Sequence, residues 1–233
     1  MIKIICNNNA EKHMNLIKFS KIISSRLCHD LISPAGALSS GLELLEEDMT
    51  SSSEVFELIK RSSSSLNKRL VFYRAAWGEL SFSTKSLNDL LGIIQSYCQT
   101  YNVQFIMDES HFLSAVNDDP NIFSGYAKVL LCGTSLIKDI LPQGGILRLQ
   151  FLDYPEGKSL VFVFEGRLYN LKDEMIQILV DDFDESLITT KTIHCLLLRL
   201  YVSEINLMLN INGSNDTKLV INATKQNLIE EKG

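Results

Sequence analysis

The first half of this 233-residue chain contains two long stretches in which mostly apolar positions recur at helical spacing. The first stretch has these positions at Leu27, Leu31, Ala35, Leu38, Leu42 and Leu45. The second has them at Phe56, Ile59, Ser63, Leu66, Leu70, Tyr73 and Trp77, in steps that alternate between three and four. Such steps place each set along one face of an α-helix. The sequence therefore predicts two consecutive long helices, and this constrains the fold more than any other feature.

Each set of positions forms a row of mostly apolar side chains along its helix, here called a seam. Two helices joined by a short polar segment cannot bury seams of this length by themselves. The economical solution is a four-helix bundle made by two copies of the chain. The alternative is that both helices pack on the rest of the same chain. The regularity of the second seam favours the homodimer.

The pattern changes near residue 80, where strand-like and helical segments begin to alternate. Strands are expected at 80–83, 103–107, 146–154, 159–166, 207–211 and 218–224, and helices at 86–101, 120–141 and 192–206. This order predicts a mixed sheet with its helices on one face. We expect an α + α/β protein with two domains, a helical hairpin over residues 1–79 and an α/β sandwich over residues 80–233.

Charge and cysteine content argue against several classes of protein. With 22 basic and 28 acidic residues the net charge is −6, whereas a nucleic-acid-binding protein normally presents a basic face. The five cysteines form no CxxC pair and mostly lie in apolar runs, as reduced, buried thiols do. No apolar run is long enough for a membrane span or a secretory signal. We therefore expect a cytoplasmic protein that binds neither nucleic acid nor membrane.

The histidine of the first predicted helix lies on the side away from the leucine stripe. An α-helix turns by about 100° per residue, so His29 is about 200° from both Leu27 and Leu31. We expect its side chain to face solvent, with Ser25, Arg26, Ile32, Ser33 and Gly36 as near neighbours. Most exposed helical histidines have no special role, so the residues around His29 decide whether it has one.

The residues around this histidine favour a functional role. Asp30 follows directly, and a carboxylate can orient an imidazole and favour the tautomer with a nucleophilic nitrogen. Ser33 is one turn on, and its hydroxyl can meet a phosphoryl oxygen or a water. Pro34 removes an amide donor, which leaves the carbonyl of Asp30 without its usual helical partner. Gly36 keeps the surface low and Ile32 adds an apolar side chain, as suits a docking face.

The segment "CHDLISPAGALSSGLELLEED" resembles the phosphoacceptor helix of two-component signalling proteins, with a histidine, an acid and then a proline five residues after the histidine. More narrowly, it resembles the alphaproteobacterial histidine phosphotransferases of the ChpT type, whose helix reads close to "CHDLISPxGAxxxGLELL". The second helix, "ELIKRSSSSLNKRLVFYRAAWG", is also similar to that of the family. The match is dense over residues 26–78, and beyond them "LPQGGILRLQF" is the best local similarity.

The resemblance implies a dimer whose C-terminal domain is a degenerate form of the sensor-kinase ATP-binding domain. It implies a protein that carries a phosphoryl group from an aspartate on the receiver domain of a hybrid histidine kinase to an aspartate on the receiver domain of a response regulator. His29 is then the phosphorylated residue and Asp30 its orienting acid. Ser33 stands where sensor kinases often have Thr or Asn. We expect Mg²⁺ to come from the receiver, and this chain to bind no cofactor.

Nucleotide-binding motifs are missing from the C-terminal half. The helix at 120–141 has no asparagine in its interior, and the segment "EGRLYNL", which follows "LVFVF", has one glycine and no aspartate. No GxxxxGK[ST] or GxGxxG motif occurs in the chain. No metal-ligand spacing of the zinc type occurs either. We therefore expect no nucleotide site, no metal site and no autokinase activity.

We expect a receiver-docking face on the hairpin, formed by Arg26, Ile32, Gly36, Arg69 and Arg74. Two alternatives remain open. The first is a dimeric scaffold that binds receiver domains without carrying phosphate. The second is a remnant of a sensor kinase that still binds ATP weakly. Acid-labile phosphate on His29 would distinguish the main hypothesis from the first, and nucleotide titration from the second.

Overall fold

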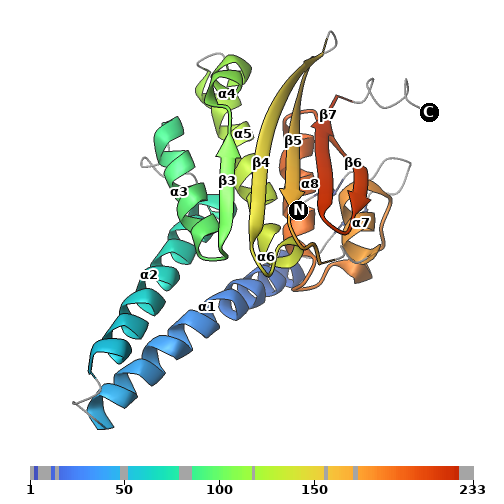
Figure 1. Cartoon of the computed structure of the whole chain (residues 1–233). Helices are drawn as coiled ribbons and strands as arrows, with labels where there is room; N and C mark the ends of the chain where they lie inside the picture. Colours follow the sequence, from blue (N-terminus) through green and yellow to red (C-terminus); the bar gives the residue numbers. More distant parts are fainter. Residues whose placement is uncertain are drawn as a thin grey trace.

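A long helical hairpin projects from an α/β body in the computed structural model of the chain (Figure 1). The structure describes residues 3–4, 12–13, 16–47, 52–78, 86–116, 119–154, 157–169 and 173–225. The hairpin consists of α1 (Leu16–Glu47) and α2 (Ser52–Trp77). These helices confirm the two predicted from the spacing. Two short strands, β1 (Lys3–Ile4) and β2 (Lys12–His13), pair antiparallel ahead of the hairpin.

The body is built on a five-stranded mixed sheet with the order β3-β4-β5-β7-β6. Its strands are β3 (Val103–Met107), β4 (Gly145–Tyr154), β5 (Gly157–Glu165), β6 (Met208–Asn215) and β7 (Lys218–Thr224). β3 and β4 run parallel, and the other neighbouring pairs are antiparallel. Five of the six expected strands are therefore confirmed. The sixth, at 80–83, lies outside the described residues, as does the expected domain boundary.

Among the described residues, seven helical segments accompany the sheet. They are α3 (Leu87–Gln99), α4 (Glu109–Val116), α5 (Pro120–Thr134), α6 (Ile137–Ile140), α7 (Asp173–Val180), the 3₁₀ turn η2 (Glu185–Leu187) and α8 (Ile193–Glu204). The expected helix at 120–141 is two helices, α5 and α6. The sequence did not predict α4 and α7, because two turns are too few to establish a helical period.

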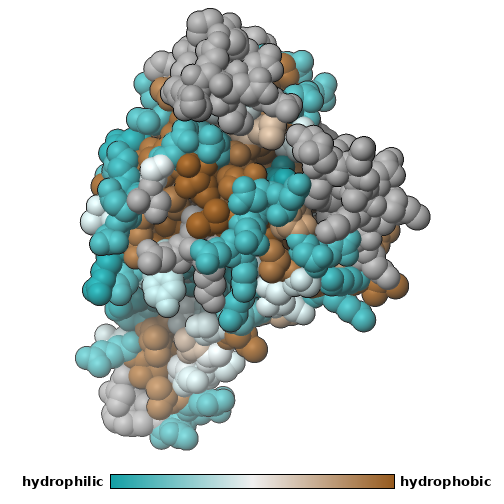
Figure 2. Space-filling view, turned by 90° about the vertical axis from the view of Figure 1, so that its right-hand side faces the viewer, coloured by the Kyte–Doolittle hydropathy of each residue, from teal (hydrophilic) through white to brown (hydrophobic). Residues whose placement is uncertain are grey.

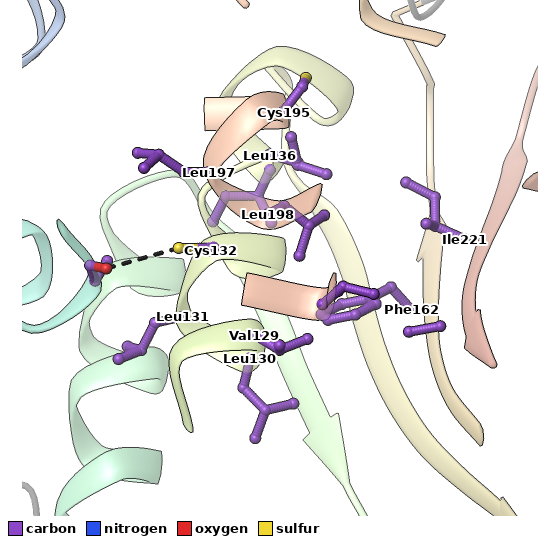
Figure 3. Packing of buried hydrophobic residues seen from close by; sticks show 14 of the residues in the cluster. Val129, Leu130, Leu131, Cys132, Leu136, Phe162, Cys195, Leu197, Leu198 and Ile221 are labelled. Carbon is purple, nitrogen blue, oxygen red and sulfur yellow. Dashed lines mark hydrogen bonds between the residues drawn. The ribbon is translucent and has the colours of Figure 1, made fainter. Parts of the chain in front are cut away.

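The core lies between the sheet and the helices α5 and α8. On β5, Leu160, Phe162 and Phe164 are fully buried and alternate with the residues of the other face. Phe162 points toward α5 (Figure 3), where a side chain at Gly133 would lie 2.2 Å from its ring. Gly133 thus allows α5 to lie directly on the sheet.

The upper end of α2 belongs to the same core as the body. Phe72 is fully buried and stacks on Tyr97 of α3, with ring centroids 3.5 Å apart. The ammonium of Lys128, on α5, donates a hydrogen bond of 2.7 Å to the carbonyl of Ala75 and another to the carbonyl of Gly78. A cation therefore caps the C-terminal end of α2, where helix carbonyls lack partners.

The seam predicted on α2 divides into two parts. Near the body, Tyr73 is buried against the same chain, as the alternative to a dimer requires. Farther out, Phe56 is 59% exposed and Leu70 is also exposed. Figure 2 shows hydrophobic side chains on the surface of the projecting hairpin. A single chain thus leaves the outer part of the seam uncovered.

Candidate active site

The exposed face of α1 carries the predicted histidine. The side chain of His29 is 73% exposed, and Ile32 and Ser33 are exposed beside it. At Gly36 an added Cβ would meet nothing within 4 Å, so the surface is low there. The expected solvent-facing position of His29, with these three neighbours, is confirmed.

Asp30, the next residue, lies on the buried side of α1 and is the centre of the site. It is only 1% exposed, and all four lone-pair positions of its carboxylate have a donor. Its Oδ1 lies 3.1 Å from His29 Nδ1 and accepts from the ammonium of Lys138. Its Oδ2 accepts from Arg26 Nε at 2.9 Å and from the hydroxyl of Tyr73 at 2.7 Å.

The proline of α1 acts as expected on the helical hydrogen bonds. The carbonyl of Asp30 cannot receive an amide proton from Pro34, which has none. Arg69, on α2, donates its Nη1 to this carbonyl at 2.8 Å. A side chain of the neighbouring helix thus replaces the missing amide. The guanidinium of Arg69 also lies over the ring of Tyr101, 4.8 Å from its centroid.

Arg26 is not on the exposed face, and the expectation that it lies there is wrong. It is 5% exposed and lies between two carboxylates. Its Nε donates to Asp30, and its Nη2 donates to Asp139 of α6 at 2.9 Å. Its Nη1 donates to the carbonyl of Thr190 at 3.2 Å. The reason is the step of four from Arg26 to Asp30, which places both side chains on the side of α1 that meets the body.

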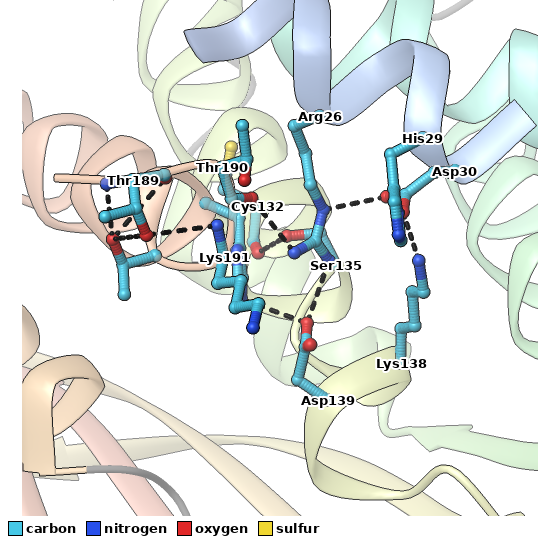
Figure 4. A network of polar contacts seen from close by, with 12 residues as sticks. Arg26, His29, Asp30, Cys132, Ser135, Lys138, Asp139, Thr189, Thr190 and Lys191 are labelled. Carbon is cyan, nitrogen blue, oxygen red and sulfur yellow. Dashed lines mark hydrogen bonds and ion pairs between the residues drawn. The ribbon is translucent and has the colours of Figure 1, made fainter.

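Lys138 and Asp139 are site residues that the sequence analysis did not identify. They lie on α6, between apolar residues of the run "SLIKDIL". A charged pair inside an apolar run is the one signal that could have pointed to them. Figure 4 shows Lys138 extending from α6 toward Asp30 and His29, and Asp139 on the other side of Arg26.

The surroundings keep Asp30 ionised. Burial alone would raise the pKa of this carboxyl, but Arg26 and the hydrogen bonds from Lys138 and Tyr73 outweigh it and hold the pKa well below its usual range. A carboxylate can only accept hydrogen bonds, so His29 Nδ1 must be the donor. The lone pair of the neutral imidazole is then on Nε2, the nitrogen away from Asp30.

A series of hydrogen bonds through α2 and α3 also supports Asp30. The hydroxyl of Tyr73 gives its proton to Asp30, so it accepts from the hydroxyl of Tyr97, which is 3.1 Å away. Burial raises the pKa of both phenols, so both stay neutral. The side chain that holds His29 is thus itself held by residues of α2 and α3.

A cavity of about 320 Å³ adjoins the histidine on the side of α6. His29, Lys138, Asp139, Tyr169, Thr190 and Lys191 are among its lining residues. Within the described part of the chain, no group of three or more His, Cys, Asp and Glu side chains is arranged to hold a metal ion. The remaining docking candidates are on α2, where Arg74 is exposed and Arg69 is half-buried.

Comparison with known proteins identifies the family. The model for the histidine phosphotransferase C-terminal domain matches residues 99–217, about half of the chain. The chain belongs to the histidine phosphotransferase family. This confirms the class of protein that the helix containing His29 indicated. The matched region begins in α3, so it does not include His29.

Relatives of this histidine phosphotransferase include the protein phosphotransferase ChpT of Brucella abortus (strain 2308). That protein is 25% identical over 167 residues, which cover 71% of this chain and 76% of the relative. A solved structure described as a bacterial phosphotransferase has the same fold, with a TM-score of 0.72 and 21% identity over 91% of this chain and 98% of that one. Among the residues of this chain that the structure describes, none of the helices has the length and hydrophobicity of a membrane span.

Proposed function

We propose that this histidine phosphotransferase acts in a phosphorelay and carries the phosphoryl group on Nε2 of His29. The observation that carries the proposal is the contact between His29 Nδ1 and the buried carboxylate of Asp30. It leaves an exposed imidazole nitrogen with a lone pair toward solvent. A neutral imidazole in this orientation is a competent nucleophile for an acyl phosphate.

Transfer onto His29 needs one bond to form and one to break. The lone pair of Nε2 attacks the phosphorus of an aspartyl phosphate on a receiver domain. The bond between phosphorus and the aspartyl oxygen breaks, and its electron pair goes to the receiver's carboxylate. The proton on Nδ1 stays in its hydrogen bond with Asp30, whose charge stabilises the cationic ring. The reverse reaction passes the group to a second receiver.

Most of the catalysis in such a transfer is positioning and charge neutralisation. Mg²⁺ would come from the acidic pocket of the receiver, because oxygen-rich sites of that kind bind it. This chain would bind no cofactor and would not phosphorylate itself from ATP. Ser33 is exposed one turn from His29, where its hydroxyl could meet a phosphoryl oxygen or an attacking water.

The receiver would dock on the exposed face of the hairpin. His29, Ile32 and Gly36 share this face on α1, and the exposed Arg74 adds positive charge on α2. Arg26 would support the site from below and would not touch the partner, because it is buried. The two partners would be the receiver domains of a hybrid histidine kinase and of a response regulator.

We also propose that the working form is a homodimer in the cytoplasm. The support for the dimer is the uncovered part of the α2 seam at Phe56 and Leu70, together with Leu42 and Leu44 on α1. Two hairpins would cover each other's apolar surface in a four-helix bundle.

A phosphotransfer assay tests the main proposal. Wild type and His29→Ala are each mixed with a radiolabelled, phosphorylated receiver domain without ATP. We expect acid-labile, base-stable label on wild type and none on His29→Ala. If both variants bind receivers and neither takes label from any of them, the chain is a scaffold instead. Calorimetric titration with Mg²⁺ and ATP is the companion measurement. A clear binding signal would show that the chain is a sensor-kinase remnant instead.

A further inference from the structure

Lys138 brings a positive charge from the body to the histidine on the hairpin. Its ammonium and His29 Nδ1 bond the same oxygen of Asp30, so only two hydrogen bonds separate the ammonium from the ring. The side chain is 24% exposed and lines the cavity that adjoins His29. Lys138 and the ring that the proposed function phosphorylates therefore line the same cavity and share one carboxylate oxygen.

The ammonium has capacity to bind a further anion. It carries three N–H donors, and the one hydrogen bond found for it among the described residues goes to Asp30. Asp30 keeps Arg26 and Tyr73 as donors on its other oxygen if Lys138 moves away. The flexible four-carbon stem of a lysine allows such a movement.

We propose that Lys138 binds the phosphoryl group while His29 carries it, an inference that rests on the proposed function of His29. Transfer brings a group with two negative charges onto Nε2, close to the negative charge of Asp30. As the P–O bond breaks and the N–P bond forms, the ammonium of Lys138 turns from Asp30 Oδ1 to the phosphoryl oxygens. It gives up no proton. The contact lowers the free energy of phosphohistidine relative to the receiver's aspartyl phosphate.

Lys191 provides a matched control for the charge. It is exposed, lies in the turn before α8 and lines the same cavity. Its backbone amide donates a hydrogen bond to Thr189 Oγ1. Replacing it removes one positive charge from the cavity and leaves the contacts of Asp30 intact.

The test compares four full-length proteins, wild type, Lys138→Gln, Lys138→Arg and Lys191→Gln. Glutamine keeps a donor for Asp30 and removes the charge, and arginine keeps both. The equilibrium constant for transfer between a phosphorylated receiver and His29 is measured from the label on each protein. Receiver affinity is measured separately with the unphosphorylated receiver, and folding is checked by circular dichroism.

We expect Lys138→Gln to lower the equilibrium constant for transfer onto His29 by roughly 10- to 100-fold, the usual effect of one hydrogen bond to a charged group. Lys138→Arg should restore most of it, Lys191→Gln should change it less than about threefold, and receiver affinity should not change. The proposal is overturned if Lys138→Gln behaves like Lys191→Gln, or if weaker docking accounts for the loss. If wild type itself takes no label, the proposed function fails and this inference fails with it.

Discussion

The buried and half-buried charges under His29 are balanced and tightly connected. Arg26 and Lys138 face Asp30 and Asp139, two cations against two anions. A buried ion pair is a weak source of stability, because desolvation offsets much of the attraction. The clearer effect of this network is on position, since it fixes Asp30, and Asp30 fixes the ring of His29.

His194 is the residue of this network that should make the fold sensitive to acid. It is fully buried at the start of α8, and its Nε2 lies 3.2 Å from Asp139 Oδ2 without the geometry of a hydrogen bond. Burial lowers the pKa of His194 from 6.5 to about 4, although Asp139 opposes the shift. The folded protein therefore holds a neutral imidazole at a pH where the unfolded chain binds a proton.

We predict that the free energy of unfolding falls as the pH drops from 6.5 to 4, by roughly 3 kcal/mol from His194 alone. Above pH 6.5 the imidazole is neutral in both states and contributes no pH dependence. Below pH 4 both states bind the proton and the loss is complete. Urea denaturation of wild type and His194→Gln across this range measures the difference. An equal pH dependence in both proteins would show that His194 is not the cause.

The junction of hairpin and body depends on how individual helices end. α2 ends inside the core, where its last carbonyls receive the ammonium of Lys128 from α5. The same ammonium lies 5.6 Å from the centroid of the Tyr201 ring on α8. A lysine that is almost fully buried thus connects three helices.

Replacing Lys128 by Met should lower the free energy of unfolding by about 1–3 kcal/mol, because buried carbonyls at the end of α2 lose their donor. Methionine keeps the length of the side chain, so the loss reflects the hydrogen bonds more than the packing. Urea denaturation measures the change, with Lys60→Met on the exposed side of α2 as the matched control. Equal stability of the two variants would contradict the capping role.

At the scale of the whole molecule, the site lies where the projecting hairpin meets the body. α1 contributes His29 and Asp30, and α6 of the body contributes Lys138. The outer part of the hairpin makes no contribution to this site and carries exposed apolar side chains. Under the proposed homodimer, the outer part of the hairpin would join the two chains and the part next to the body would hold the histidine.

Phe56→Asp should weaken the proposed homodimer by at least about 30-fold, because a charge would enter an apolar interface. The matched control is Leu113→Asp on α4, an apolar side chain that is 51% exposed and far along the chain from the hairpin. Light scattering coupled to size-exclusion chromatography over a dilution series gives the mass. Wild type and Leu113→Asp should have twice the chain mass where Phe56→Asp is a monomer. A wild type that is monomeric at every concentration would rule out the dimer.

The sequence by itself determined the features that depend on local spacing. Helical periodicity predicted the hairpin, the three longer helices of the body and the exposed position of His29, because a period fixes which side chains share a face. Pro34 predicted a free carbonyl at Asp30, because proline has no amide proton in any fold. Only the tertiary structure decided which distant groups meet Asp30. Tyr73 and Lys138 are 43 and 108 residues away from it in sequence, and no local pattern relates residues so far apart. For the same reason, only the packing of α1 on the body showed that Arg26 is buried.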